Sequence, residues 1–278
     1  MKAVPNRAPS VRAVAVCYHM KPDRFIERLD SLAADAGIRL RGVVVNNQPE
    51  HASLPHVGAF QVVQGTNHHL DFSGYFEGLQ HLLVIGDSDA SNVLFMNDSL
   101  LTAHASSAIF RRVIALDRLL QQLEVPAGVG KLDPYRSICL RNPWSGHGSY
   151  LSTFCFLLNR SAQPILRRLI ADAETDGVLS EAPLEDLNWG AGLTPLMREY
   201  IRAHLVYDGS PYRWRAAAPE PELIRKKAQC VYFEHRLSGS LGLEGALVPI
   251  NAGPRSRLAV TSAETATRLL RALKGQAA

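Results

Sequence analysis

The sequence predicts an α/β protein with a mostly parallel central sheet and helices on both of its faces. Apolar runs rich in β-branched residues alternate along the chain with segments whose apolar residues recur at helical spacing. This alternation is typical of parallel strands joined by helical crossovers. With 278 residues, of which 46% are hydrophobic and 20% charged, the chain has enough apolar material for a large core.

The first third of the chain carries most of the predicted strands. An apolar run opens it at 11–20. The following segment, 21–37, has apolar residues at helical spacing and Gly37 as a natural C-terminal stop. A second helix is expected at 75–86. The other strands of this part are expected at 38–48, 59–65 and 93–97.

The rest of the chain is predicted to be mainly helical, with one further strand at 149–160. Its helices are expected where apolar residues recur at helical spacing, and the last of them has Thr194 as N-cap and Pro195 at its first position. These helices span 106–125, 163–174 and 193–206. Beyond Tyr207 the pattern weakens until a short basic amphipathic helix at 262–275.

The bulk composition excludes some classes of protein. A formal net charge of +4 is too small an excess to indicate a nucleic-acid partner. Four cysteines occur without a CxxC pair, and Cys17 and Cys155 lie in apolar runs, which favours buried free thiols and a reducing compartment. Neither a signal peptide nor a run of roughly 18 apolar residues, the length of a membrane span, is visible. We therefore expect a cytoplasmic protein.

Polar side chains follow three of the predicted strands at the point where each strand ends. Parallel α/β sheets bind their ligands beyond the carboxyl ends of the strands, so these positions are candidate ligand-binding residues at one edge of the sheet. The alternative is that each group only starts a turn, as Asn and Asp often do. The groups are Tyr18-His19, Asn46-Asn47 and Asn97-Asp98-Ser99.

A second informative stretch is "TNHHLDFSGYFEGLQ" at 66–80. Ser73 and Gly74 leave little side-chain bulk where the chain enters a helix, and backbone N–H groups at a helix start can hold an anion. Asp71 is placed to hydrogen-bond nearby hydroxyls. In the simpler alternative, Asp71 or Ser73 only caps the helix.

This stretch carries a family resemblance. The pattern Asn67-x-x-x-Asp71-Phe-Ser-Gly-x-x-x-Gly78-Leu, followed by a strand ending "FMNDS", resembles bacterial sugar transferases of the rhamnan-synthesis type. They are family-2-like nucleotide-sugar transferases with the GT-A fold. The later "GHGSYLSTFCFLLNRSA" resembles the strand that follows the donor site in this family. The resemblance covers about 11–162.

The resemblance implies a catalytic domain at 11–210, with a donor-binding half at 11–105 and an acceptor half at 106–210. Residues 211–278 would form a C-terminal extension packed on or near the active site. The donor would be a nucleotide-diphosphate sugar, and the acceptor a saccharide or a lipid-linked glycan. The implied donor-binding residues are His19, Asn46, Asn47, Asn67, Asp71, Ser73, Gly74, Asn97, Asp98 and Ser99.

In GT-A transferases the strand equivalent to 93–97 commonly ends in Asp-x-Asp, which holds a divalent cation on the donor diphosphate. Here only Asp98 of that motif is acidic. Either Asp98 holds Mg²⁺ or Mn²⁺ together with phosphate oxygens, or the Asn97–Ser99 group binds hydroxyls without a metal. A literal Asp-x-Asp at 87–89 precedes the strand, so it is expected at the opposite edge of the sheet.

An inverting glycosyl transfer needs a general base for the acceptor hydroxyl. Glu185-Asp186 followed by Trp189 resembles the acceptor-side motif of family-2-like transferases, with Asp186 as first choice for the base and Glu185 as second. Trp189 would stack on a sugar face. Alternatively, the two acids simply favour a helix start. His147, between two glycines, is a candidate acceptor contact.

The late part of the chain supplies cations. Arg213, Arg215, Lys226 or Lys227 would neutralise a departing diphosphate, although most surface cations do no such thing. The basic helix near the C-terminus, with Arg268, Arg271 and Lys274, would allow peripheral contact with anionic lipid at the inner membrane face. It fits an ordinary solvated helix equally well.

The leading functional hypothesis is a glycosyltransferase that moves a hexosyl or deoxyhexosyl group in surface polysaccharide synthesis. The alternative is a non-catalytic glycan-binding or scaffold protein that retains the GT-A fold, and Asn97 in place of an acid favours it. A dehydrogenase is disfavoured because no Gly-x-Gly-x-x-Gly follows the first strand.

Overall fold

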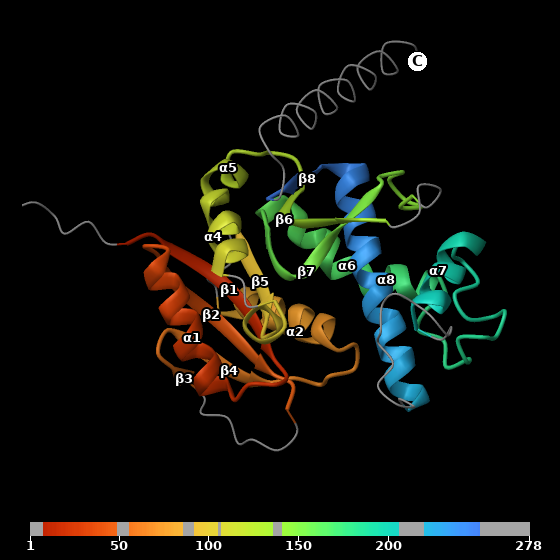
Figure 1. The fold of residues 1–278 in the computed structure, drawn as a ribbon, viewed down its shortest axis with the longest axis horizontal. Coiled ribbons are helices and arrows are strands. Elements are labelled where there is room, and N and C mark those ends of the chain that lie inside the picture. Colours follow the sequence, from red (N-terminus) through yellow and green to blue (C-terminus); the bar gives the residue numbers. More distant parts are fainter. Residues whose placement is uncertain are drawn as a thin grey trace, which may run out of the picture.

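The computed structural model describes residues 8–48, 56–85, 92–104, 107–135, 141–205 and 220–250. In this part of the chain eight strands form one mixed, mostly parallel sheet, in the order β3-β4-β2-β1-β5-β7-β6-β8 (Figure 1). The predicted α/β class is confirmed. The strands are β1 (Ser10–Cys17), β2 (Arg39–Asn46), β3 (His56–Val57), β4 (Phe60–Gln64), β5 (Val93–Asn97), β6 (Ala127–Pro134), β7 (Ser149–Leu158) and β8 (Ala246–Pro249).

The parallel part of the sheet contains a reversal of strand order. Strands β4, β2, β1 and β5 run parallel, whereas β7 is antiparallel to β5 and to β6. From β1 the chain moves to β2 on one side, and from β4 it crosses to β5 on the other side of β1. The order therefore reverses between β1 and β5, and such a switch point is where open α/β sheets bind ligands.

Helices cover both faces of the sheet, as predicted. One face packs against α2, α6, α7 and α8, and the other against α1, α4 and α5. Each face buries its own apolar cluster, which is the usual solution for a sheet with no solvated side. The helices are α1 (Pro22–Asp35), α2 (Asp71–Val84), α3 (Ser99–Thr102), α4 (Ser107–Ala115), α5 (Asp117–Gln121), α6 (Gln163–Thr175), α7 (Pro195–Leu205) and α8 (Pro221–Glu244), with a 3₁₀ turn at Arg160–Ala162.

Helix α2 lies close to β1 because two of its residues have no side chain. A Cβ placed on Gly74 would lie 2.6 Å from Cγ2 of Val16, and one placed on Gly78 would lie 2.4 Å from Cγ1 of Val14. Both glycines, four residues apart, face the same strand. This close approach brings the first turn of α2, which starts at Asp71 rather than at the predicted residue 75, next to the switch point.

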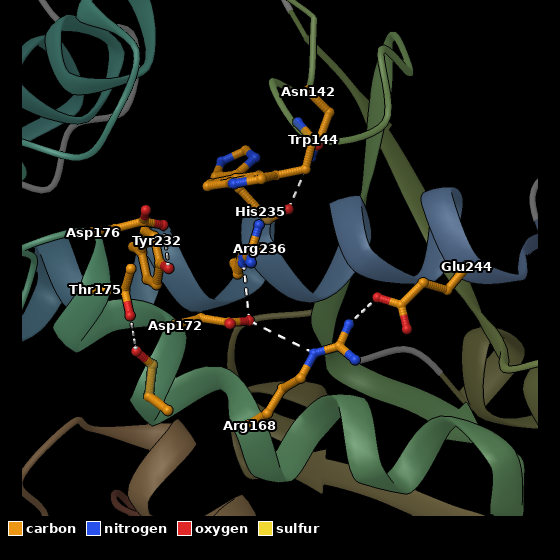
Figure 2. A network of polar contacts seen from close by, with 11 residues as sticks. Asn142, Trp144, Arg168, Asp172, Thr175, Asp176, Tyr232, His235, Arg236 and Glu244 are labelled. Carbon is orange, nitrogen blue, oxygen red and sulfur yellow. Dashed lines mark hydrogen bonds and ion pairs between the residues drawn. The ribbon is translucent and has the colours of Figure 1, made fainter.

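A polar network joins helix α8 to α6 and fixes the orientation of α8 about its own axis (Figure 2). Asp172 of α6 accepts a hydrogen bond from Nε of Arg236 at 3.0 Å and pairs with Arg168 at 3.8 Å. The guanidinium of Arg236 lies over the ring of Trp144, 4.9 Å from its centroid. Arg168 also pairs with Glu244 at the end of α8. The opposite side of α8 faces the sheet.

The structure differs from the sequence prediction in other places as well. The helix predicted at 106–125 is two helices, separated at Leu116, where Asn92 donates to the carbonyl and the carboxylate of Asp117. Strands β3, β6 and β8 were not predicted. The long helix α8 was missed as well, because it is buried on most sides and lacks a clear polar face.

The predicted C-terminal extension is part of the same fold where it is described. Strand β8 belongs to the central sheet, and α8 packs in the larger apolar cluster. The basic helix predicted at 262–275 lies outside the described residues. Within the described residues no helix is long and apolar enough to cross a membrane. Cys17 and Cys155 are buried free thiols, as predicted.

Candidate active site

The three predicted strand-end groups do lie side by side. Cys17 at the end of β1 pairs with Asn46 on β2, and Val16 pairs with Asn97 on β5. The polar residues after these strands therefore share one edge of the sheet, at the switch point. Their side chains, however, are used in different ways.

Asp98 ties the loop after β1 to the end of β5. Its Oδ2 accepts hydrogen bonds from the backbone N–H groups of three successive residues, at 2.8 Å from Tyr18, 2.5 Å from His19 and 2.9 Å from Met20. The side chain is only 1% exposed. Asp98 is therefore a structural anchor of the site.

This arrangement does not fit a divalent cation held by Asp98. Mg²⁺ and Mn²⁺ need accessible oxygen ligands, whereas one oxygen of Asp98 already accepts three N–H groups and the residue is buried. No group of three or more His, Cys, Asp or Glu side chains suited to a metal occurs among the described residues. The predicted role of Asp98 as a metal ligand is thus corrected to an anchoring role. The Asp-x-Asp at 87–89 lies outside the described residues.

Asn46 and Asn47 are also engaged within the protein. Nδ2 of Asn46 donates to Gln64 at 3.2 Å, and its Oδ1 accepts from the N–H of Gln48 at 3.1 Å. Nδ2 of Asn47 donates to the carbonyl of Leu70 at 3.3 Å. Both asparagines are almost completely buried. They shape the strand ends and do not line the cavity described below.

The predicted anion site at the start of α2 is built for packing instead. Oγ of Ser73 accepts from the N–H of His69 at 2.5 Å, and Gly74 faces Val16 of β1. Asn67, in a left-handed conformation with φ of 55°, is hydrogen-bonded through Oδ1 to the hydroxyl of Tyr18. These residues fix the turn that presents Asp71. His19 contributes its backbone N–H, and its side chain is exposed.

A polar cavity of about 180 Å³ opens beside the end of β5 and the start of α2. This is smaller than the roughly 300–1,000 Å³ typical of small-molecule sites, so it would hold only part of a large ligand. Three predicted residues, Asp71, Asn97 and Ser99, line it. The other lining residues are His104, Ser152, Thr153, Phe154, Lys227, Cys230, Val231 and Glu234. Of these, only Lys227 was predicted, as one of four candidate cations.

Helix α8 contributes one face to this cavity. Lys227 and Glu234 are seven residues apart, with Cys230 and Val231 between them, so all four fall on one side of the helix. The spacing is present in "KAQCVYFE", but the surrounding apolar residues hide it in the sequence. Burial raises the pKa of the Cys230 thiol to about 12, which keeps it neutral and unreactive.

The charged groups of the cavity affect one another. Burial raises the pKa of Asp71, while the charge of Lys227 and a hydrogen bond from Asn97 lower it. Burial raises the pKa of Glu234 to about 7, against the effect of its hydrogen bonds with Thr153. The carboxyl group of Glu234 therefore changes protonation near neutral pH, which is the range suited to general acid–base catalysis.

The acids predicted as general base lie outside the cavity. Asp186 accepts from the N–H of Asn188 at 2.8 Å, a local turn contact, and its carbonyl accepts from Nη2 of Arg202 at 2.7 Å. Glu185 is exposed. Neither is among the lining residues. The simpler alternative, a pair of acids that favours a helix start, is not what the structure has either: these two residues lie in a turn, and α7 starts only at Pro195.

The predicted acceptor residues are also elsewhere. Trp189 is 0% exposed in the apolar core, so it offers no free ring face to a sugar, and this prediction is corrected. The ring of His147 lies against Gly242 of α8, where a Cβ would be 2.9 Å from its Cε1. Gly242 is eight residues beyond Glu234, about 12 Å along the helix. His147 is thus outside the cavity.

A comparison with protein-family models and with curated proteins finds no match to this chain. We therefore infer the function from the fold, the cavity and the motif resemblance.

Proposed function

We propose that this protein is a glycosyltransferase of the GT-A type that takes a sugar from a nucleotide-diphosphate donor. The acceptor would be a saccharide or a lipid-linked glycan in surface polysaccharide synthesis. The observation that carries the proposal is the polar cavity at the β1/β5 switch point, which combines Asp71, Asn97 and Glu234 with the cation Lys227. A sugar diphosphate needs this combination of hydroxyl-binding oxygens and a counter-charge.

The groups divide naturally between the two parts of such a donor. Asp71 and Asn97, which are hydrogen-bonded to each other, present oxygen and amide groups to sugar or ribose hydroxyls. Lys227 supplies positive charge for the diphosphate, since an ammonium group stabilises the negative charge that develops on phosphoryl oxygens. The cavity holds only part of the donor, and we place the sugar and the adjoining phosphate in it.

The proposal is tested by incubating the full chain with a panel of uridine-, thymidine- and guanosine-linked hexoses and 6-deoxyhexoses. Release of nucleoside diphosphate is measured with and without mixed oligosaccharide acceptors. We expect release from at least one donor. No release and no binding of any nucleotide in the panel would contradict the proposal.

The non-catalytic alternative is favoured by one specific observation, the use of Asp98 as a structural anchor. A protein of that kind would bind a nucleotide sugar or a glycan in the same cavity and release no nucleoside diphosphate from any donor. The same assay, combined with calorimetric titration, separates the two functions.

A further inference from the structure

Glu234 is held in the cavity by a specific pair of hydrogen bonds. Its Oε1 accepts from the backbone N–H of Thr153 at 2.8 Å and from the Thr153 hydroxyl at 2.9 Å. Both donors lie on β7, so the carboxyl group bridges α8 and the sheet. Its other oxygen, Oε2, has no hydrogen-bond donor within the described part of the chain. One oxygen is therefore fixed, and the other is available to a ligand.

The other carboxylates near the switch point are less suited to accept a proton from a ligand. Asp98 is buried and accepts three backbone N–H groups. Asp71 is hydrogen-bonded by Asn97 and lies in the field of Lys227. Asp186 makes a turn contact outside the cavity. Of these four, Asp71 and Glu234 line the cavity, and Glu234 is the one whose Oε1 is fixed by two donors of β7 while no donor of the described residues reaches its Oε2.

We propose that Glu234 is the general base of the transfer and that Thr153 is its positioning residue; this inference rests on the proposed function. Oε2 of Glu234 takes the proton of the acceptor hydroxyl while the hydroxyl oxygen forms a bond to the anomeric carbon. The bond from that carbon to the diphosphate oxygen breaks, and its electron pair leaves with the nucleoside diphosphate. The new carboxylic acid then returns its proton to solvent.

The surroundings of Glu234 are consistent with this role. Burial and the charge of Asp133 on β6 favour the neutral acid, whereas the Thr153 bonds and the charge of Lys227 favour the carboxylate. Asp71 from α2 and His104, which follows α3, also face the cavity. Burial lowers the pKa of His104, so it adds little positive charge near neutral pH. The opposing influences leave a base that ionises close to working pH.

The test compares Glu234→Gln with Glu222→Gln, a matched change at an exposed carboxylate on the same helix that pairs with Lys226. Nucleoside diphosphate release is measured with the donor that turns over best, together with the Kd for the free nucleoside diphosphate. We expect Glu234→Gln to lower kcat by about 100-fold or more, with a Kd within about twofold of the unaltered protein. Glu222→Gln is expected to leave both values unchanged.

A second measurement follows the pH dependence of kcat, first in the unaltered protein. The kcat of the unaltered protein should rise with pH through one ionisation near pH 7, and Glu234→Asp should keep a weakened, shifted limb. Undiminished kcat in Glu234→Gln, or a flat profile of the unaltered protein across this range, would overturn the assignment while leaving the proposed function intact. Failure of the unaltered protein to release any nucleoside diphosphate would overturn both.

Discussion

Glu234 on α8 and Thr153 on β7 are joined by two hydrogen bonds, although they are 81 residues apart in the sequence. Because both donors stabilise the carboxylate, they oppose the burial that raises its pKa to about 7. Through this pair, the position of α8 affects the protonation of the Glu234 carboxyl group in the cavity.

Removing the Thr153 hydroxyl should therefore change the pH dependence of the reaction. In Thr153→Val one of the two bonds to the carboxylate is lost, so the pKa of Glu234 should rise further. The rising limb of the kcat profile should move to higher pH, with little change in the plateau. Thr153→Ser, which keeps the hydroxyl, should restore the limb. If the rising limb of the kcat profile does not move in Thr153→Val, Thr153 does not affect the group that titrates.

Glu234 should also affect stability in a predictable direction. Its pKa is raised from 4.5 to about 7 on folding, so its contribution to stability is present below the unfolded pKa and is lost as pH rises through the folded pKa. The unaltered protein and Glu234→Gln should differ little near about pH 4.5, and the variant should become relatively more stable near about pH 8. Melting temperatures at the two pH values test this. A gap between the variants that is independent of pH would contradict it.

His235 makes the opposite contribution on the acid side. Burial lowers its pKa to about 3, and its Nδ1 is hydrogen-bonded with the hydroxyl of Tyr135 at 2.7 Å. The unfolded chain binds a proton near the ordinary pKa of 6.5 and the folded chain does not, so stability falls as pH drops below about 6.5. Denaturant unfolding between about pH 7 and pH 4 should show a shallower fall for His235→Gln. If the free energy of unfolding falls equally steeply with pH in both proteins, the neutral, buried state of the His235 imidazole is contradicted.

Asp98 is predicted to matter for stability. Asp98→Ala leaves three backbone N–H groups of the β1 loop without their acceptor, which should lower the free energy of unfolding by about 3 kcal/mol. Asp35→Ala, at an exposed carboxylate at the end of α1, should change it by less than about 0.5 kcal/mol. Urea unfolding measures both. An Asp98→Ala protein of normal stability would instead suit a ligand-binding or metal-binding carboxylate.

Gly78 should tolerate no side chain. A Cβ there would lie 2.4 Å from Cγ1 of Val14 and 3.1 Å from Cγ2 of Val45. Gly78→Ala must push α2 away from the sheet and should cost about 1–3 kcal/mol, despite the better helix propensity of alanine. A melting temperature equal to or above that of the unaltered protein would show that α2 is not in this close contact.

Much of the fold is visible in local sequence patterns. Strand β5 occupies 93–97 as predicted, and α7 starts at Pro195, with Thr194 accepting from the N–H of Met197 at 3.3 Å. These elements have a clear apolar run or a clear cap, so short-range physics determines them. Helix α8 has neither, because twelve of its residues are buried and its stability comes from tertiary packing.

The site was less predictable than the fold. The strand-end rule located the correct edge of the sheet and two lining residues, Asn97 and Ser99, and the helix-start stretch at 66–80 supplied a third, Asp71. It could not show that the Asp98 carboxylate accepts hydrogen bonds from backbone N–H groups some 80 residues away. Nor could it bring Lys227 and Glu234 to this edge, since their approach depends on how α8 packs over the sheet.

The central claim, that the cavity binds a nucleotide diphosphate through Lys227, is tested most directly by calorimetric titration of the full chain with UDP, dTDP and GDP. Lys227→Met is compared with Lys226→Met, the neighbouring lysine that pairs with Glu222 and does not line the cavity. We expect one nucleotide to bind the unaltered protein and Lys226→Met alike, and Lys227→Met at least about tenfold more weakly. Equal affinity in all three proteins, or no binding to any, would contradict the claim.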